Sequence, residues 1–182
     1  MRTDDETCDA EVIARVTPSA EPGPTPPPDG DDELVRQLYP ALHRLACVVC
    51  PPERDPRDLI QDALERALRH GPLGALDAPL PYLRRAVVRL AANERRGLGR
   101  LRRATPRLAP TSDAEVPAYP SDVGELLALA PLDRAALWLA DVEGRPSAEV
   151  AEILGCRPDA ARARVARARR KLRSLLDEED AR

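Results

Sequence analysis

Apolar residues recur at spacings of three and four along most of the chain, which is the period of an amphipathic α-helix. β-Branched and aromatic residues are few, whereas Ala, Leu and Arg are abundant, and this balance disfavours strands and favours helices. We therefore expect an all-α fold. The predicted helices cover about 31–49, 56–70, 80–97, 122–130, 131–142, 147–154 and 158–176.

Local signals set the boundaries of these helices. Asp55 followed by Pro56 is the clearest start, because a short acceptor side chain caps free amides and proline suits the first helical position. Asp31 or Asp32 is expected to cap the first helix in the same way. Pro40 falls inside that helix, so we expect a kink or a break there.

Proline-rich segments divide the chain into two helical units. Residues 1–30 hold six Pro among many acidic residues and are expected to form a disordered arm. Residues 102–121 hold four Pro without periodicity and are interpreted as a linker. The predicted units are therefore 31–101 and 122–176, followed by an acidic tail at 177–182.

The formal net charge of −3 hides a strong asymmetry along the chain. Residues 1–33 carry a net charge of −8, whereas residues 82–107 carry +8 and residues 157–173 carry +7. Two separate basic blocks on a nearly neutral chain indicate two contacts with a polyanion. The alternative is that both blocks are simply solvated arginine-rich helix faces.

Composition excludes several classes of protein. No apolar run approaches the ~20 residues that a membrane-spanning helix needs. The acidic N-terminus has no apolar segment typical of a secretory signal. Without such a signal, the four Cys residues favour reduced thiols and a cytoplasmic chain. No nucleophile motif or glycine-rich phosphate loop is present, so we expect neither an enzyme nor a cofactor.

The end of the chain has the pattern of a helix-turn-helix. A short helix that Ser147 can cap is followed by a turn at Gly155 and by a basic helix that begins at Pro158. In this motif the first helix braces the second, which presents Arg to the major groove and the phosphates. An ordinary helical hairpin with a charged face is the alternative interpretation.

Three motifs of one family resemble stretches of this sequence. Residues 147–155, SAEVAEILG, together with the arginine-rich residues 162–172, resemble region 4 of bacterial sigma factors of the extracytoplasmic-function (ECF) group. Upstream, residues 55–67, DPRDLIQDALERA, resemble the core-binding helix of region 2 in that family. Residues 82–96 resemble the promoter-melting helix that follows it.

The resemblance implies a transcription initiation factor that binds core RNA polymerase, helps open the −10 promoter element and recognises the −35 element. Core RNA polymerase, promoter DNA and an anti-sigma factor are the implied partners. The residues implied to meet polymerase are Asp58, Gln61, Asp62 and Arg66. Those implied to contact DNA are Arg84, Arg85, Arg89, Arg95 and Arg96 at the −10 element and Arg162, Arg164 and Arg167 at the −35 element. We expect all five arginines of the melting helix to face outward. The acidic arm is hypothesised to screen the basic surfaces until polymerase displaces it.

The chain also departs from the family pattern. Arg89 stands where the melting helix usually has Asn, and Arg157 and Ala160 stand where the recognition helix usually has Ser and Thr. These departures leave two other functions open. One is a free-standing helix-turn-helix regulator, and the other is a sigma-like interaction protein that does not initiate transcription.

His43, Cys47 and Cys50 form a competing constellation, because at helical spacing they lie on about one face and could ligate Zn²⁺. No convincing fourth ligand is nearby in the sequence, and cysteine is often simply buried. Core packing is therefore the preferred interpretation, and we assign no metal. Cys156 and Trp138 are likewise expected to pack in the core.

Overall fold

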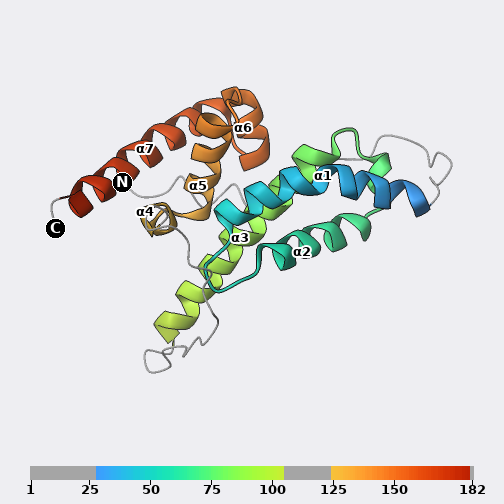
Figure 1. Ribbon diagram of the computed structural model, residues 1–182, viewed down its shortest axis with the longest axis horizontal. Coiled ribbons are helices and arrows are strands. Elements are labelled where there is room, and N and C mark those ends of the chain that lie inside the picture. Colours follow the sequence, from blue (N-terminus) through green and yellow to red (C-terminus); the bar gives the residue numbers. More distant parts are fainter. Residues whose placement is uncertain (1–27, 105–123, 181–182) are drawn as a thin grey trace.

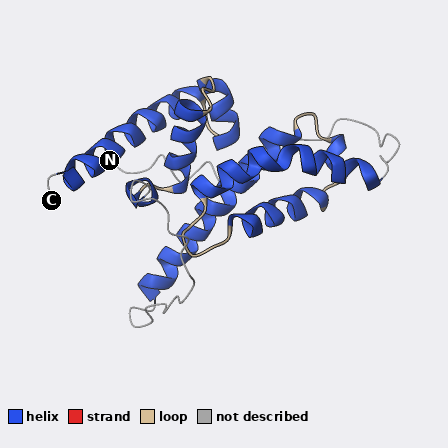
Figure 2. Cartoon of the chain, in the orientation of Figure 1, coloured by secondary structure: helices blue, strands red, loops and turns tan. Residues whose placement is uncertain are grey.

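The computed structural model describes residues 28–104 and 124–180, and these residues form helices and connecting turns without any strand (Figures 1 and 2). The predicted all-α fold is confirmed. The elements are α1 (Pro28–Val49), α2 (Pro56–Leu68), the 3₁₀ turn η2 (Leu73–Ala75), α3 (Pro79–Ala104), α4 (Gly124–Ala128), α5 (Pro131–Leu137), the π-helical turn η4 (Trp138–Val142), α6 (Ser147–Leu154) and α7 (Pro158–Asp180). Most of the predicted arm and linker, and with it their predicted disorder, lies outside the described residues.

Helices α1, α2 and α3 pack against one another as the first helical unit. The start of α2 agrees with the prediction: the Asp55 side chain accepts a hydrogen bond of 2.8 Å from the amide of Arg57, and Pro56 takes the first helical position. The apolar face of α2 places Leu59 and Ile60 in the core. This local signal therefore sets the start of the helix.

The first helix differs from its prediction in two respects. It begins at Pro28 rather than at Asp31 or Asp32, and the Asp31 carboxylate instead accepts a hydrogen bond of 3.3 Å from the amide of Gly74. It also continues through Pro40, so the predicted break is wrong. Pro40 lies on the exposed side of α1, where water can satisfy the carbonyl that loses its amide partner.

The second helical unit contains α4 to α7, with the predicted helix-turn-helix in α6 and α7. Gly155 ends α6 in the left-handed conformation, with φ of 69°, as a glycine C-cap should. Ser147 is the first residue of α6 and not its cap, which is Pro146. The predicted single helix over 131–142 is interrupted, since its second half is the π turn η4.

The two units share one hydrophobic core. Leu45 of α1 and Val88 of α3 belong to the same buried cluster as Leu139 of η4 and Ile153 of α6. Helix α3 contacts α5 and α6, while α1 contacts α5, so the second unit rests on the first (Figure 1). The domain boundaries remain a prediction, but the described helices pack as one body.

Arg134 of α5 connects the units at the centre of this contact. Its side chain is 2% exposed and donates hydrogen bonds to the carbonyls of Val49, at 2.6 Å, and Cys50, at 3.1 Å. It also donates to the carbonyls of Leu127 and Leu129, at 3.1 and 3.2 Å. Burial lowers the pKa of Arg134 to about 10, so the group still carries its charge at neutral pH. One cation therefore satisfies carbonyls at the end of α1 and around α4.

Candidate nucleic-acid interface

Helix α7 presents a broad basic face to solvent. Its buried stripe is narrow and consists of small residues, with Ala161, Val165 and Ala168 packed inward. Most of the other sides of α7 are therefore exposed to solvent. The exposed cationic residues of α7 are Arg162, Arg167, Arg169, Arg170, Lys171 and Arg173. We call this set the basic face of α7.

Ion pairs within the protein hold some of the arginines on α7. Arg162 pairs with Asp159 and donates a hydrogen bond of 3.2 Å to the Ser147 hydroxyl. Arg164 is three-quarters buried as a side chain and pairs with Asp133 of α5 at 2.9 Å. Arg164, one of the predicted DNA contacts, thus braces α7 against α5 instead of pointing freely outward.

Other cations on α7 have no such restraint. Among the residues that the structure describes, Arg167, Arg170, Lys171 and Arg173 have no hydrogen-bond or ion-pair partner. The sequence interpretation included Arg167 but missed Arg170. The signal was available, because residues three apart share a helix face. These unpaired guanidinium groups are available for phosphates or guanine edges.

The predicted polymerase contacts on α2 fall into two groups. Asp58, Gln61 and Arg66 are exposed. Asp62 instead pairs with Arg54 at 2.7 Å, and Arg54 also pairs with Glu94 of α3. Asp62 thus helps to hold α2 against α3, a role that its place in the sequence did not indicate.

The arginines of α3 do not all face outward as expected. Arg95 and Arg96 are exposed, but Arg84 is only 2% exposed, so the prediction for Arg84 is wrong. Arg85 and Arg89 are half-buried beneath the turn between α6 and α7. A Cβ atom on Gly155 in that turn would lie 2.8 Å from Nη2 of Arg89 and 3.0 Å from Nη2 of Arg85. Gly155 therefore leaves room for both guanidinium groups.

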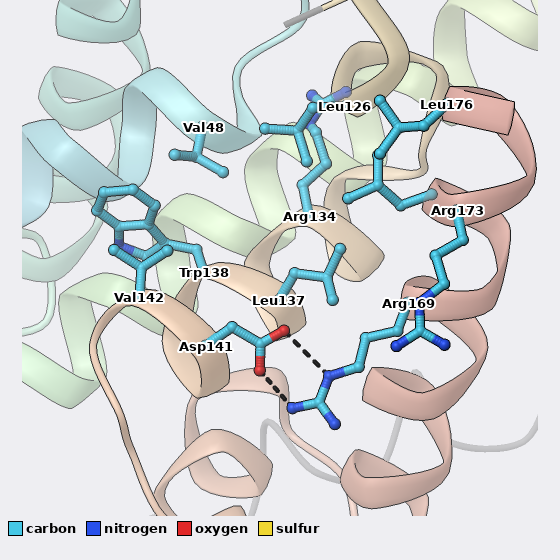
Figure 3. A pocket seen from close by; sticks show the side chains of 11 residues that line it. Val48, Leu126, Arg134, Leu137, Trp138, Asp141, Val142, Arg169, Arg173 and Leu176 are labelled. Atoms are coloured by element: carbon cyan, nitrogen blue, oxygen red, sulfur yellow. Dashed lines mark hydrogen bonds and ion pairs between the residues drawn. The ribbon is translucent and has the colours of Figure 1, made fainter. Parts of the chain in front are cut away.

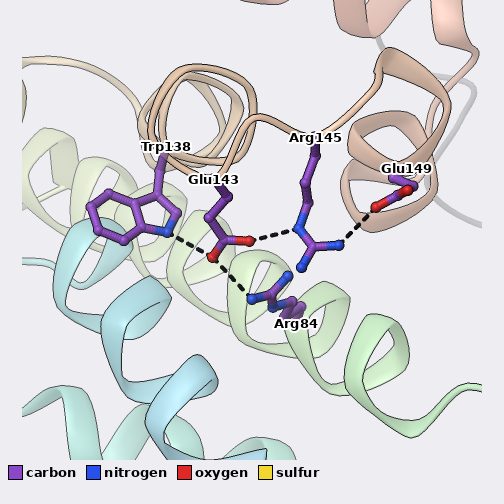
Figure 4. Close-up of polar contacts among 5 residues, drawn as sticks. All are labelled: Arg84, Trp138, Glu143, Arg145 and Glu149. Carbon is purple, nitrogen blue, oxygen red and sulfur yellow. Dashed lines mark hydrogen bonds and ion pairs between the residues drawn. The ribbon is translucent and has the colours of Figure 1, made fainter.

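Arg84 meets a carboxylate of the second unit. Its Nη2 lies 2.9 Å from Oε1 of Glu143, which directly follows η4 (Figure 4). Trp138 donates to the same oxygen at 3.0 Å, and Arg145 donates to the other carboxylate oxygen at 2.6 Å. Burial alone would raise the pKa of Glu143, but these hydrogen bonds and the charge of Arg84 outweigh it and hold the pKa below its usual range. Glu143 is therefore a firmly ionised group at the junction of the two units.

The thiols near the end of α1 lie partly or wholly in the core. Cys50 is 4% exposed, and its thiol donates to the carbonyl of Arg54 at 3.3 Å. Cys47 is half-buried, with its sulfur 3.6 Å from Nδ1 of His43. Across the described residues, no group of three or more His, Cys, Asp or Glu side chains is arranged to hold a metal ion. These positions agree with the core-packing interpretation.

A cavity of about 390 Å³ separates the C-terminal half of α7 from α1 (Figure 3). Val48 of α1 and Trp138 of η4 line one part of it, and Leu176 of α7 lines another. Asp141 and Arg169 form an ion pair at its edge, so these two polar groups already satisfy each other. The walls are otherwise mainly apolar, and the close contacts between the units lie elsewhere, at α3, α5 and α6.

Within residues 28–104 and 124–180, no helix has both the length and the apolar character that crossing a bilayer requires.

Comparisons with known proteins agree on one family. The family described as Sigma-70, region 4, matches residues 125–172. The ECF RNA polymerase sigma factor SigM of Mycobacterium tuberculosis, found in two strains, is 33% identical over 155 residues, which cover 80% of this chain and 76% of that protein. Among solved structures, the sigma factor RpoE of Bartonella quintana, in complex with the anti-sigma factor NepR, superposes with a TM-score of 0.63. That match has 21% identity and covers 82% of this chain and 98% of the other, so it supports the fold.

Proposed function

Because the chain belongs to the ECF group of RNA polymerase sigma factors, we propose that its described surfaces divide promoter recognition among α2, α3 and α7. The protein is a transcription initiation factor that directs RNA polymerase to promoters. The observation that supports this division of roles is that two helices in different units, α3 and α7, are rich in arginine. Helix α2 instead has a polar face without a block of basic residues. It acts by binding, without catalysis, and in the cytoplasm, where polymerase and DNA meet.

Helix α7 is the element that enters the major groove of the −35 element. Its guanidinium groups supply forked donors that suit guanine edges and phosphates. Arg162, Arg167 and Arg170 carry this contact, and the exposed Ala163 and Ala166 between them are small enough to approach a thymine methyl group. Arg164 contributes indirectly, since its pair with Asp133 fixes the orientation of α7.

Helix α3 contacts the opened −10 element through the exposed Arg95 and Arg96 and the half-buried Arg85 and Arg89, whereas Arg84 is buried against Glu143. Tyr82 is its one aromatic residue near these arginines, so stacking of unpaired bases contributes little. Capture of the separated strand then depends mainly on guanidinium–phosphate contacts. Such contacts release counterions and weaken steeply as salt is added. We therefore expect strand capture by the holoenzyme to be strongly salt-dependent.

The exposed face of α2 docks on core polymerase. Asp58, Gln61 and Arg66 are the contact residues, because they are exposed. Asp62, whose side chain is 41% exposed, supports this face through its ion pair with Arg54. The exposed carboxylate of Asp58 on this face suits a basic surface on the partner.

The test is co-elution of the full chain with core RNA polymerase. Asp58→Arg should abolish stable co-elution, because it reverses one exposed charge on α2 without breaking any described contact. Asp32→Arg makes the same charge change on the exposed side of α1 and should leave co-elution intact. Equal losses in both variants, or no loss in either, would remove α2 as the docking face.

An anti-sigma factor is the proposed regulatory partner. RpoE of Bartonella quintana was solved with the anti-sigma factor NepR. We propose that this chain is held by a protein of the same kind. Purification of the tagged full chain from its own cells, before and after induction, is the direct test: a stoichiometric partner that blocks core binding is the supporting result. Recovery of the chain with core polymerase alone under all conditions would contradict this.

A further inference from the structure

The cavity between α1 and the C-terminal half of α7 leaves apolar side chains in contact with water (Figure 3). Val142 of η4 is 64% exposed and Leu176 of α7 is 42% exposed, and both line this cavity. Among the described residues, Leu68 of α2 is the only other large apolar side chain with comparable exposure. The volume of about 390 Å³ falls within the ~300–1,000 Å³ that is usual for binding sites. Exposed apolar residues gathered in this way mark an interaction site.

The lining of this cavity is basic as well as apolar. Arg134, Arg169 and Arg173 line it, against the single carboxylate of Asp141. Arg134 donates to carbonyls at the end of α1 and beside α4, and Arg169 is paired with Asp141. Arg173 has neither a hydrogen bond nor an ion pair within the described part of the chain. The cavity therefore suits an apolar ligand that carries a carboxylate beside its apolar part.

The acidic arm contains one segment with this chemistry. Val12, Ile13 and Val16 are the only Val, Ile or Leu residues before α1. Spacings of three and four place Val12 and Ile13 on the same side of a helical turn as Val16. Residues 4–11, which directly precede them, hold five carboxylates and no basic residue. We call residues 12–16 the apolar segment of the arm.

The apolar segment is close enough along the chain to reach the cavity. The cavity meets α1 at Val48, which lies ~30 Å along the helix from Pro28. Residues 17–27 between the segment and α1 hold five Pro, and a chain of that composition extends by ~3.1 Å per residue. The distance that it can span from Val16 to Pro28 is then ~37 Å, which exceeds the distance required.

An exposed stripe of α1 leads along this span. Arg36, Pro40 and Arg44 are exposed at intervals of four residues, so they are neighbours on one side of the helix. Val48 follows Arg44 after one further turn and lines the cavity. The arm can therefore follow α1 back toward α7 over the surface, without passing through the core.

We propose that the cavity is the docking site for the apolar segment of the chain's own arm. Ile13 inserts between Val142 and Leu176, and a carboxylate just before it lies against Arg173. A weak contact is sufficient, because a short linker holds the segment at an effective concentration of ~1 mM. Docking also places the remaining carboxylates of the arm beside the basic face of α7. The proposal stands on the cavity and the arm, and it does not depend on the assignment of α7 to DNA.

A second copy of the chain is a less suitable occupant of the cavity. A symmetric contact through this surface would bring Arg169 and Arg173 of one copy against the same arginines of the other. Like charges brought together oppose association. The arm instead brings the opposite charge, and its tether removes most of the entropic cost of association.

The first test moves the single lysine side chain of the protein to the edge of the cavity. Lys171 is the only lysine, so Lys171→Arg with Arg173→Lys relocates the amine without changing the net charge. A zero-length carbodiimide joins this amine to carboxylates in contact with it, and mass spectrometry of the peptides identifies them. Lys171→Arg with Arg66→Lys is the matched control, because it places the amine on the exposed side of α2. We expect cross-links from position 173 to residues 4–11, and none to those residues in the control.

The second test reports on the cavity from its own wall. Trp138 lines the cavity and is the only tryptophan of the chain. Ile13→Asp adds a charge to the apolar segment and should undock it, whereas Ala20→Asp adds the same charge outside that segment. If half of the molecules are docked and docking shields the indole, undocking about doubles the constant for quenching by acrylamide. We expect this rise, with emission shifted to longer wavelength, in Ile13→Asp alone.

The two tests together distinguish the arm from other occupants. Cross-links to residues 4–11, with a quenching change in Ile13→Asp alone, support docking of the arm. Cross-links from position 173 only to Asp141 or Asp177, or equal quenching changes in both aspartate variants, overturn it. In an equal mixture of unlabelled and isotope-labelled chains, cross-links that join the two kinds would assign the cavity to a second copy and overturn the proposal. Quenching that responds to added core polymerase but not to Ile13→Asp would assign the cavity to a partner protein and likewise overturn it.

Discussion

Helices α3 and α7 carry the same kind of charge but present it in opposite ways. Each belongs to an arginine-rich block of the sequence, with net charges of +8 and +7. In the structure, the basic face of α7 lies in water, whereas Arg84 of α3 is 2% exposed and paired with Glu143. The density of charge along a helix therefore does not determine whether that charge is available to a ligand.

The difference follows from the position of each helix in the fold. Helix α3 contacts α1 and α2 on one side and α5 and α6 on another, so more than one of its faces is covered. Helix α7 lies at the outside and contacts its own unit through small residues. A central helix has to bury some of its polar positions, and each buried charge then needs a partner.

The largest expected effect comes from removing the residue that joins the two units. Arg134→Ala leaves several buried carbonyls at the end of α1 and around α4 without a donor. We expect the free energy of unfolding to fall by about 3–5 kcal/mol, because each orphaned buried group costs ~1–3 kcal/mol and water recovers part of it. Urea denaturation followed by circular dichroism measures the change.

Arg169→Ala is the matched control for that experiment. Arg169 is also paired, with Asp141, but its side chain is half exposed. Its removal should leave the urea midpoint unchanged. Similar shifts in both variants would mean that Arg134 does not join the units.

The next effect distinguishes the two basic helices in the free chain. Arg167→Ala with Arg170→Ala removes two unpaired cations from α7. We expect duplex binding to weaken by about 10- to 100-fold, and the slope of log affinity against log salt concentration to fall in magnitude by about 2. Salt titrations of the free chain on a random duplex give both quantities. An unchanged slope would show that these residues do not meet phosphates.

The corresponding change in α3 should behave differently in the free and polymerase-bound states. Arg85→Ala with Arg89→Ala should change single-strand binding by the free chain less than about twofold, because both side chains are half-buried beneath the turn between α6 and α7. In the holoenzyme the same double substitution should weaken binding of the separated strand about tenfold. A large loss in the free chain would mean that α3 is already accessible there.

The smallest effect concerns a thiol beneath the junction of the units. Burial raises the pKa of Cys50 to about 11, against the charges of Arg54 and Arg134. At pH 8 about one thiol in a thousand is then ionised, and Cys50 should resist iodoacetamide. Mass spectrometry after alkylation should find Cys50 unmodified in the native chain and modified in Arg134→Ala. Rapid modification in the native chain would show that the junction is already open.

Most of the fold was predictable from local sequence, and so was part of the site. Asp55 with Pro56, and Gly155 at the end of α6, act through their immediate backbone. Several of the missed features depend on partners outside the same helix. Asp31 binds Gly74 instead of capping α1, and Asp62 binds Arg54 instead of lying free.

What the sequence determined by itself is the helical period, the helix-turn-helix, the family and the presence of two basic blocks. These follow from neighbouring residues, whose spacing is fixed by the helix. Only the tertiary structure decided which arginines are free: Arg134 and Arg84 are buried because α5 and the segment after η4 pack on the first unit. Periodicity assigns a residue to a face, but whether that face meets water or another helix depends on contacts such as that of Arg84 with Glu143, 59 positions apart.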